Sequence, residues 1–456
     1  MTLFKSLLLG TAAGIVATAG ASAADLPSKK AAPATYVKIC DAQGAGFFFL
    51  PGTDTCIKIG GLVRVDYQYM PVRNSGVAAA TNAYAVRDAA DVGLNTAAFY
   101  NRAVINFDAR TPSAWGTVRT FGQMRMQSGE GTMWYDKDTK VPSLEAAYIQ
   151  FAGFTIGQGA QPFAFMSSWA FNSAYWTGWP NGVRQLSYTA TLGGGFSATA
   201  AITDSKGGYS IGTDGNPGIA SSPLGTQTWV RNGPVYVGTV RLDQAWGSAQ
   251  VMGAYNAASN LGSAYAATSA TNVNLTNFEA GYAYGAGLSF KLPMLAAGDE
   301  LQLTAVYQSR MSKMISDAKL NTPSASSWGA APLGGPAVDF TNGNGWGVGA
   351  QLKHFWTSTV RSQVYASYTA RKLYVSNTST TVADSDSTAY SLGTALIWSP
   401  VANFDIGIEA QYLRAQWGKG AVGAQFAVSN TAGWSNWNVK PTEDNYSTKV
   451  RVERRF

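Results

Sequence analysis

The sequence predicts an all-β protein, a 16-stranded antiparallel transmembrane β-barrel with short periplasmic turns, long extracellular loops and a third loop folded into the lumen. Three observations predict it. Hydrophobic residues make up 46% of the chain and charged residues only 13%, about half the charged share of roughly 25% in soluble domains. No stretch after the N-terminus reaches the ~18 uninterrupted apolar residues of a spanning helix. Sixteen strand-like segments follow one another, and since only helices and closed barrels pair every backbone group in lipid, a barrel remains.

The first 23 residues predict a secretory signal peptide. Lys5 supplies a positive start, residues 7–19 form a short apolar run, and Ala21, Ser22 and Ala23 form a small-residue cleavage site. A retained membrane anchor is the weaker alternative, because the run is too short to span a bilayer. Cleavage removes one lysine, so the formal net charge of +7 becomes +6.

Residues 24–56 predict an N-terminal leader ahead of the barrel. Its first part, residues 24–35, carries proline and lysine, and we expect it to be flexible. Cys40 and Cys56 are the only cysteines, and an even pair in an exported protein favours a disulfide. Two cysteines and the single histidine, His354, are too few and too far apart for a metal site. We expect neither a metal nor a cofactor.

Residues 57–456 predict the barrel, because polar and apolar residues alternate there with period two. The alternation is clearest in the first three segments, 57–69, 99–109 and 117–127. The other thirteen expected strands are 144–151, 154–158, 183–192, 196–204, 235–243, 248–255, 277–291, 300–310, 346–355, 360–373, 388–399, 404–412 and 446–456. The last segment ends in Phe456 on the apolar parity, which is typical of the closing strand of outer-membrane barrels.

The connections between these segments alternate strictly between short and long. The eight long ones are residues 71–98, 128–143, 160–182, 205–234, 256–276, 311–345, 374–387 and 413–445. Antiparallel neighbours connected in this way place all turns at one end of the barrel and all long loops at the other. A soluble sandwich has no reason to sort its connections so, and the whole segment is expected to form one domain.

The third long connection, residues 160–182, has an unusual composition. It holds no charged residue and seven aromatic ones, which are Phe163, Phe165, Trp169, Phe171, Tyr175, Trp176 and Trp179. Aromatic rings need a surface on which to bury, and Pro162 and Pro180 with the missing alternation argue against a core strand. We expect the loop to fold inward and narrow the barrel. The alternatives are an irregular core segment or an exposed aromatic patch at the membrane interface.

Basic residues recur on the polar parity of several strands and predict a basic wall inside the pore. The residues are Lys58, Arg64, Arg102, Arg119, Arg125, Arg361 and Arg371. Charges on the lipid face cost roughly 2–4 kcal/mol at the midplane, so we expect these side chains to point into water, where charged rings bias a pore toward anions. The alternative is that they pair with four acidic residues and only hold the wall together. Those residues are Asp66, Asp108, Asp405 and Glu409.

Three stretches resemble the alphaproteobacterial porin family, the general outer-membrane porins of rhizobia, brucellae and their relatives. They are ICDAQGAGFFFLPGTDTCIKIGGLVRVDYQY near the start, SLEAAYIQFAGFTIGQ before the aromatic loop, and VRVERRF at the end. The resemblance implies a homotrimer of sixteen-stranded barrels that passes small hydrophilic solutes passively, with outer-membrane lipid and lipopolysaccharide as surroundings. In many porins the third loop brings carboxylates to face basic wall residues. This loop has no carboxylate.

The predicted function is a passive channel in the bacterial outer membrane. An enzyme is not expected, because one histidine leaves most acid–base and triad schemes without their base and the glycine runs lack a phosphate-binding pattern. The basic excess is spread over the strands, so nucleic acid is not an expected partner. The alternatives are a surface barrel acting as adhesin or ligand receptor through its long loops, and a secreted soluble β-protein.

Overall fold

The structure is a computed structural model that describes the strands and most of the short segments that connect them. The described residues are 38–69, 97–129, 139–166, 169–171, 182–204, 228–229, 234–256, 263–264, 280–309, 311, 339–376, 382–417 and 442–456. The expected signal peptide, residues 1–23, and the first part of the leader lie outside these ranges.

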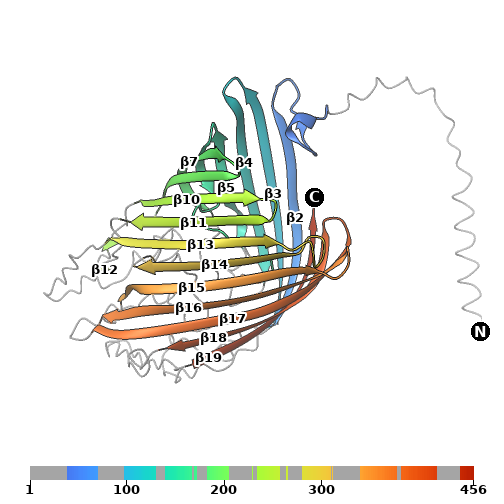
Figure 1. The fold of residues 1–456 in the computed structure, drawn as a ribbon. Helices are drawn as coiled ribbons and strands as arrows, with labels where there is room; N and C mark the ends of the chain where they lie inside the picture. Colours follow the sequence, from blue (N-terminus) through green and yellow to red (C-terminus); the bar gives the residue numbers. More distant parts are fainter. Residues whose placement is uncertain are drawn as a thin grey trace, which may run out of the picture.

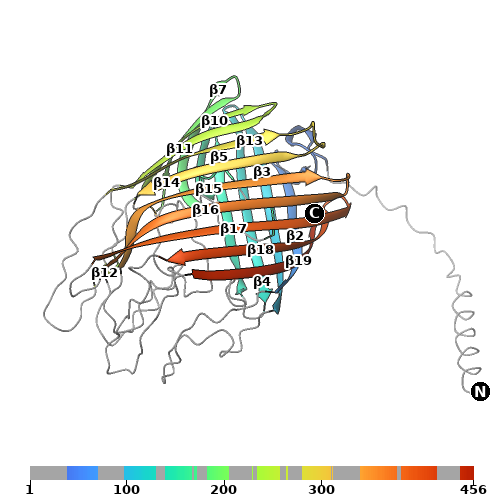
Figure 2. The same ribbon diagram turned by 60° about the horizontal axis from the view of Figure 1, so that its bottom comes forward.

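Sixteen antiparallel strands form one closed barrel (Figures 1 and 2). The strands are β2 (Cys56–Tyr69), β3 (Ala97–Ser113), β4 (Gly116–Gly129), β5 (Thr139–Phe151), β6 (Phe154–Gly159), β7 (Val183–Gly193), β8 (Phe196–Thr203), β10 (Val235–Gln244), β11 (Gly247–Asn256), β13 (Gly281–Lys291), β14 (Glu300–Ser309), β15 (Asp339–Phe355), β16 (Val360–Ser376), β17 (Val382–Val401), β18 (Phe404–Trp417) and β19 (Thr442–Arg455). Each strand pairs with its neighbours in sequence, and β19 pairs with β2 to close the sheet. The predicted fold class is therefore confirmed.

The closing seam uses the C-terminus of the chain. The backbone N–H of Phe456 donates to the carbonyl of Gly61 at 3.1 Å, and the N–H of Gly61 donates to the carbonyl of Phe456 at 3.0 Å. Along the seam, Arg451 faces Asp66 in register, and Glu453 faces Arg64. Because the sheet has no free edge at this seam, every strand there finds partners for its backbone groups.

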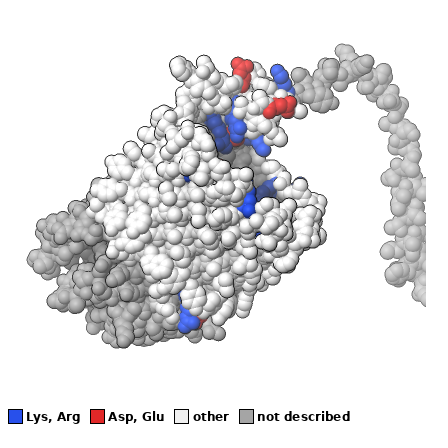
Figure 3. All heavy atoms as spheres, in the orientation of Figure 1, with Lys and Arg blue, Asp and Glu red and all other residues white. Residues whose placement is uncertain are grey.

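Side chains alternate between an apolar outer face and a polar inner face, as period two requires. On β2, Ile59 and Val63 are 57% and 53% exposed, whereas Asp66 on the opposite parity is 3% exposed. In a barrel surrounded by hydrocarbon, the exposed apolar side chains are the ones that meet lipid. Figure 3 agrees: the outer face in view is nearly free of charge, and lysine and arginine gather around a hollow at the end that carries the short turns.

The connections follow the expected alternation with one correction. Five turns have two residues, as between Phe151 and Phe154, where Ala152 and Gly153 both adopt positive φ values (49° and 86°). Such turns match the twist of the strands that they join. The expected long gap at 374–387 is wrong in length, because β16 and β17 extend and leave only residues 377–381 between them. Thr and Ser residues in a polar stretch suit an extended, paired strand as well as a loop.

Four short elements were not predicted. They are the 3-10 helix η1 (Asp41–Gln43) and the strands β1 (Phe48–Phe49), β9 (Thr228–Trp229) and β12 (Ser263–Ala264). β1 pairs with β2, and β9 pairs with β12. Short pairings of this kind depend on distant partners and leave no periodic pattern in the sequence.

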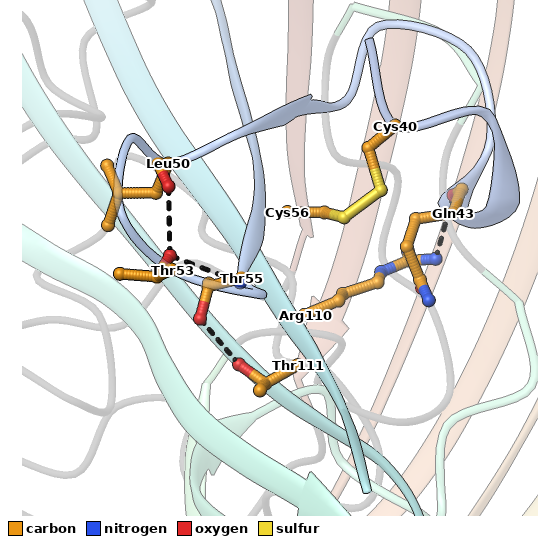
Figure 4. The surroundings of a disulfide bond; sticks show 8 residues. All are labelled: Cys40, Gln43, Leu50, Thr53, Thr55, Cys56, Arg110 and Thr111. Carbon is orange, nitrogen blue, oxygen red and sulfur yellow. Dashed lines mark hydrogen bonds between the residues drawn. A yellow bond between two sulfur atoms is a disulfide. The ribbon is translucent and has the colours of Figure 1, made fainter. Parts of the chain in front are cut away.

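The leader is fixed at the short-turn end by the Cys40–Cys56 disulfide (Figure 4). Both cysteines are buried with Phe47. The guanidinium of Arg110 donates to the carbonyl of Gln43 at 3.2 Å and lies 4.6 Å from the Phe47 ring. The predicted disulfide is confirmed, and residues 38–55 therefore stand beside the inner face of β2 and β3.

Candidate functional site: the inner face of the barrel and the loop across it

The aromatic loop begins after β6 ends at Gly159 and finishes before β7 begins at Val183. Its first anchor is Phe163, which is fully buried. The ring packs into an apolar cluster on the inner faces of β8, β10, β11, β13 and β14, made up of Ala201, Val235, Val237, Met252, Ala254, Ala283 and Val306, together with Met311. Burial of a whole Phe side chain stabilises the loop position by about 1.5–3 kcal/mol.

Glycines on the wall make room for the second part of the loop. A Cβ atom at Gly287 of β13 would lie 2.1 Å from the Phe165 ring. Phe165 also packs with Met166 against Tyr365, a buried tyrosine of β16. Tyr365 is itself accommodated by Gly393 of β17, where a Cβ atom would lie 2.1 Å from the ring. These glycines are needed because an ordinary side chain would occupy the space of the aromatic rings.

The far anchor of the loop is Phe171, and it combines packing with charge. Its ring packs against Ala395 and Ile397, and a Cβ atom at Gly407 would lie 2.5 Å from the ring. Its backbone N–H donates to the carboxylate of Glu409, and its carbonyl accepts from Arg451 Nη2 at 3.2 Å. Glu409 on β18 and Arg451 on β19 therefore hydrogen-bond to the backbone N–H and the carbonyl of Phe171.

Arg451 links this anchor to the barrel seam. Its guanidinium donates to both carboxylate oxygens of Asp66, at 2.6 and 2.7 Å, and it lies 4.7 Å from the Phe171 ring. Bidentate contacts of this kind are among the strongest side-chain hydrogen bonds. The guanidinium stack on the ring adds a cation–π contact.

Trp169 lies between the two anchors. Its backbone N–H donates to Gln351 Oε1 at 3.3 Å, and Lys353 Nζ lies 4.5 Å from its ring. The described part of the loop thus crosses from β6 to the inner faces of β13–β19, and the predicted inward fold is confirmed for these residues. Tyr175, Trp176 and Trp179 lie outside the described residues.

The loop divides the described inner face into two parts. The covered sector is the inner face of β8, β10, β11 and β13–β19, where Glu409 is 0% and Lys449 1% exposed. The open sector is the inner face of β2–β5, where the side chains of Arg119 and Arg125 are each 28% exposed and that of Glu145 is 24% exposed. Water therefore reaches the charged side chains of β3–β5, whereas Glu409 and Lys449 beneath the loop are shielded from it.

Most residues of the expected basic wall have a described carboxylate partner. The ion pairs are Arg64 with Glu453 (2.5 Å), Arg119 with Asp108 (2.9 Å), Arg125 with Glu145 (2.8 Å) and Arg361 with Asp405 (2.9 Å). Two carboxylates serve two arginines each: Asp108 also contacts Arg110, and Asp405 also contacts Arg455. Asp108 is the one carboxylate that Arg110 and Arg119 share, so that cluster is cationic, whereas Arg455 beside Asp405 also contacts the carboxylate of Glu453.

The remaining members of the expected wall are not brought together. Arg102 donates to the hydroxyl of Tyr100 at 2.9 Å, and Lys58 donates to the carbonyl of Ala45 in the leader at 3.2 Å. Arg371 lies on β16 in register with Ser387, and its side chain lies outside the described residues.

Sequence reasoning missed the residues that hold the loop. Arg451 falls on the charged parity of the last strand, which signals an inward position but not its partner. Tyr365 looks like an ordinary inward aromatic, and Gly287 and Gly407 look like ordinary strand glycines. A glycine at an inward-facing position of a strand is the one sequence signal that could have marked where the loop packs against the wall.

The single histidine has a structural role at the short-turn end. His354 Nδ1 lies 2.6 Å from Asp299 Oδ2, and Asp299 Oδ1 accepts from the backbone N–H of Phe355 at 2.8 Å. Asp299 lies in the turn between β13 and β14. Burial alone would raise the pKa of its carboxyl, but these two hydrogen bonds together with the nearby charges of His354 and Lys353 outweigh burial and hold the pKa below its ordinary value.

Asp299 should therefore make the barrel more acid-sensitive. A carboxyl whose folded-state pKa is lowered stabilises the fold above its unfolded pKa of about 3.9 and loses that contribution as the pH falls through the folded value. We expect the unfolding temperature of the wild type to fall more between about pH 5 and about pH 2 than that of Asp299→Asn. The exposed Asp41→Asn is the control and should follow the wild type. Parallel curves for wild type and Asp299→Asn would contradict this prediction.

Among the described residues, no group of three or more histidine, cysteine or acidic side chains is placed to hold a metal ion. In the same part of the chain, no helix has the length and apolar character needed to cross a membrane.

Comparison with known proteins assigns the family. The sequence model of the porin subfamily matches residues 25–440. The chain belongs to the porin subfamily. Porin Omp2b of Brucella canis and that of Brucella abortus (strain 2308) are each 30% identical to this porin over 266 residues, which is 55% of this chain. The match spans 66% of the length of those relatives, just under two thirds.

A solved structure shares the fold. The outer membrane channel DcaP of Acinetobacter baumannii superposes with a TM-score of 0.55 at 14% identity, covering 90% of this chain and 99% of that one. At this identity the likeness concerns the fold alone. The family and the barrel together place this porin in the outer membrane.

Proposed function

We propose that this protein is a passive channel through which small hydrophilic solutes and ions diffuse across the outer membrane. One observation carries the proposal: a closed barrel keeps a hydrated, charged open sector beside a loop docked on its opposite wall. A pore needs a water-filled path that the fold does not plug. The loop, residues 160–182, would constrict that path and direct solutes along β2–β5.

We further propose a weak preference for anions. The open sector presents Arg102, Arg119 and Arg125, and the pair of Arg110 and Arg119 on Asp108 leaves one positive charge in excess. Cationic clusters in a constricted aqueous path raise the local concentration of anions. The ion pairs moderate this effect, which is why the preference should be weak.

The chain's processing and assembly complete the proposal. Residues 1–23 would direct export and be cleaved, leaving the leader, residues 24–56, ahead of the barrel, residues 57–456. Family membership supports a homotrimer in contact with outer-membrane lipid and lipopolysaccharide. No enzymatic activity is proposed. The adhesin alternative depends on long loops that lie mostly outside the described residues, and no described contact favours it.

The proposal is tested by planar-bilayer recordings on the purified protein. We expect stepwise ion conductance. In a potassium chloride gradient, the reversal potential should be shifted from zero in the direction of the chloride equilibrium potential. The double variant Arg119→Gln/Arg125→Gln should move the reversal potential toward potassium, because it removes two exposed inward charges. Arg184→Gln, on the outer face, is the matched control and should leave it unchanged. A silent barrel would refute the channel, and a clear potassium preference in the wild type would refute the anion preference.

A further inference from the structure

A groove crosses the outer, lipid-facing side of the barrel over β7, β8, β10, β11 and β13. Its volume is about 700 Å³. Its floor is made of Ala200, Gly238 and Gly253, which lie side by side in register on three adjacent strands. A Cβ atom at Gly238 would meet nothing within 4 Å, and one at Gly253 would meet only the carbonyl of Ala283 at 4.0 Å. The hollow is therefore not required by packing within the chain.

Aromatic pairs form firm walls at both ends of this floor. Phe154 and Tyr188 pack with ring centroids 4.8 Å apart at one end, and Tyr284 stacks on Tyr307 at 5.0 Å at the other. Paired rings restrict each other's rotamers, so the walls are held in place before any ligand arrives.

The floor of the groove at Gly238 and Gly253 lies nearer the long-connection ends of β10 and β11 than their short-turn ends, whereas its Phe154 wall directly follows a short turn. Gly238 is the fourth residue of β10, which follows a long connection, and Gly253 is the fourth from the end of β11, which precedes one. Long connections are at the extracellular end of this barrel. The hydrocarbon chains of the outer leaflet therefore surround the floor of the groove.

A cation stands on the same outer face, closer to the extracellular end. Arg184 lies on the outward parity of β7, two residues before Leu186 of the groove lining, and its side chain is 65% exposed. Its contact with Asp204 uses one guanidinium nitrogen at 3.5 Å. An outward charge on a barrel is tolerated near the headgroups and not in the hydrocarbon. At 3.3 Å per residue, Arg184 is ~13 Å from Tyr188 along the strand.

We propose that this face binds one anionic, phosphate-bearing lipid of the outer leaflet, with an acyl chain in the groove and the phosphate at Arg184. The lining is apolar where a chain would lie and cationic where a headgroup would lie. A volume of this size suits a single small ligand. A stable subunit interface needs about 800 Å² from each partner, which a groove of a few side chains does not supply. The inference rests on the outer-membrane placement and not on channel activity.

The acyl-chain part is tested by native mass spectrometry of the full mature protein in detergent, titrated with lipid A. We expect wild type to retain one lipid A tightly, and Gly238→Leu/Gly253→Leu to bind at least tenfold more weakly, because leucines fill the groove. Open space above both glycines means that the variant should still fold. Ala286→Leu, an exposed outward position on β13 outside the groove lining, is the matched control and should bind like wild type. Equal binding by the groove-filling variant and the wild type would overturn the proposal.

The headgroup part uses a second variant pair. Arg184→Gln should weaken lipid A binding about tenfold, a change of ~1.4 kcal/mol, whereas Arg454→Gln, an exposed outward arginine near the opposite end of the barrel, should not. Dephosphorylated lipid A should bind wild type and Arg184→Gln alike. Loss of oligomers in the groove-filling variant with unchanged lipid binding would show that a second copy occupies the groove, and would overturn the proposal. Bilayer conductance should be the same in all these variants.

Discussion

Replacement of Phe163 by alanine is expected to loosen the loop and raise single-channel conductance. The ring is fully buried against the inner faces of five strands, and a Phe→Ala change at such a site costs about 3–5 kcal/mol. Part of that free energy holds the loop on the wall, so the loop should sample positions away from it. Thermal unfolding would measure the stability loss, and bilayer recordings would measure larger, noisier conductance steps.

The control for this variant is Phe99→Ala. Phe99 is 61% exposed on the lipid face of β3, so its truncation removes a ring of the same size without touching the loop. We expect wild-type conductance from it. If Phe163→Ala unfolds at a lower temperature but conducts like wild type, the loop does not need this anchor to hold its position.

Replacement of Arg451 by methionine is expected to destabilise the barrel as much as Phe163→Ala does, but for an electrostatic reason. It leaves Asp66, which is 3% exposed, without its bidentate partner and takes a donor from the carbonyl of Phe171. Breaking one side of a buried ion pair costs about 3–5 kcal/mol. Urea titration followed by tryptophan fluorescence would measure the loss, and conductance should rise because the far anchor of the loop is weakened.

Two further variants separate charge from packing. Arg184→Met removes a side chain that is 65% exposed and lies 3.5 Å from its partner Asp204, so its effect should stay below about 1 kcal/mol. Arg451→Met/Asp66→Leu removes both buried charges and should recover much of the lost stability. If the double variant is no more stable than Arg451→Met, the buried charge of Asp66 is not the cause of the loss.

The strands and their faces could be predicted because both are local properties. A strand's side chains alternate with period two wherever it pairs, so Ile59 and Val63 identify the lipid face of β2 without knowledge of its neighbours. Where most residues are Ser, Thr, Asn and Asp, as at 374–387, the pattern could not separate a loop from an extended strand, and the length of that connection was wrong. The composition of residues 160–182 likewise predicted burial of its rings, because aromatic side chains need an apolar surface.

What the amino-acid sequence by itself determined is therefore the barrel, the order of its turns and loops, the disulfide and the inward fold of the third loop. Only the tertiary structure decided which charges meet. Arg451 reaches Asp66 across 385 residues of sequence because the sheet closes on itself, and Phe171 settles over Gly407 because that wall position has no side chain. The physical reason is that alternation depends on each strand alone, whereas ion pairs and loop contacts depend on the register and curvature of the closed sheet.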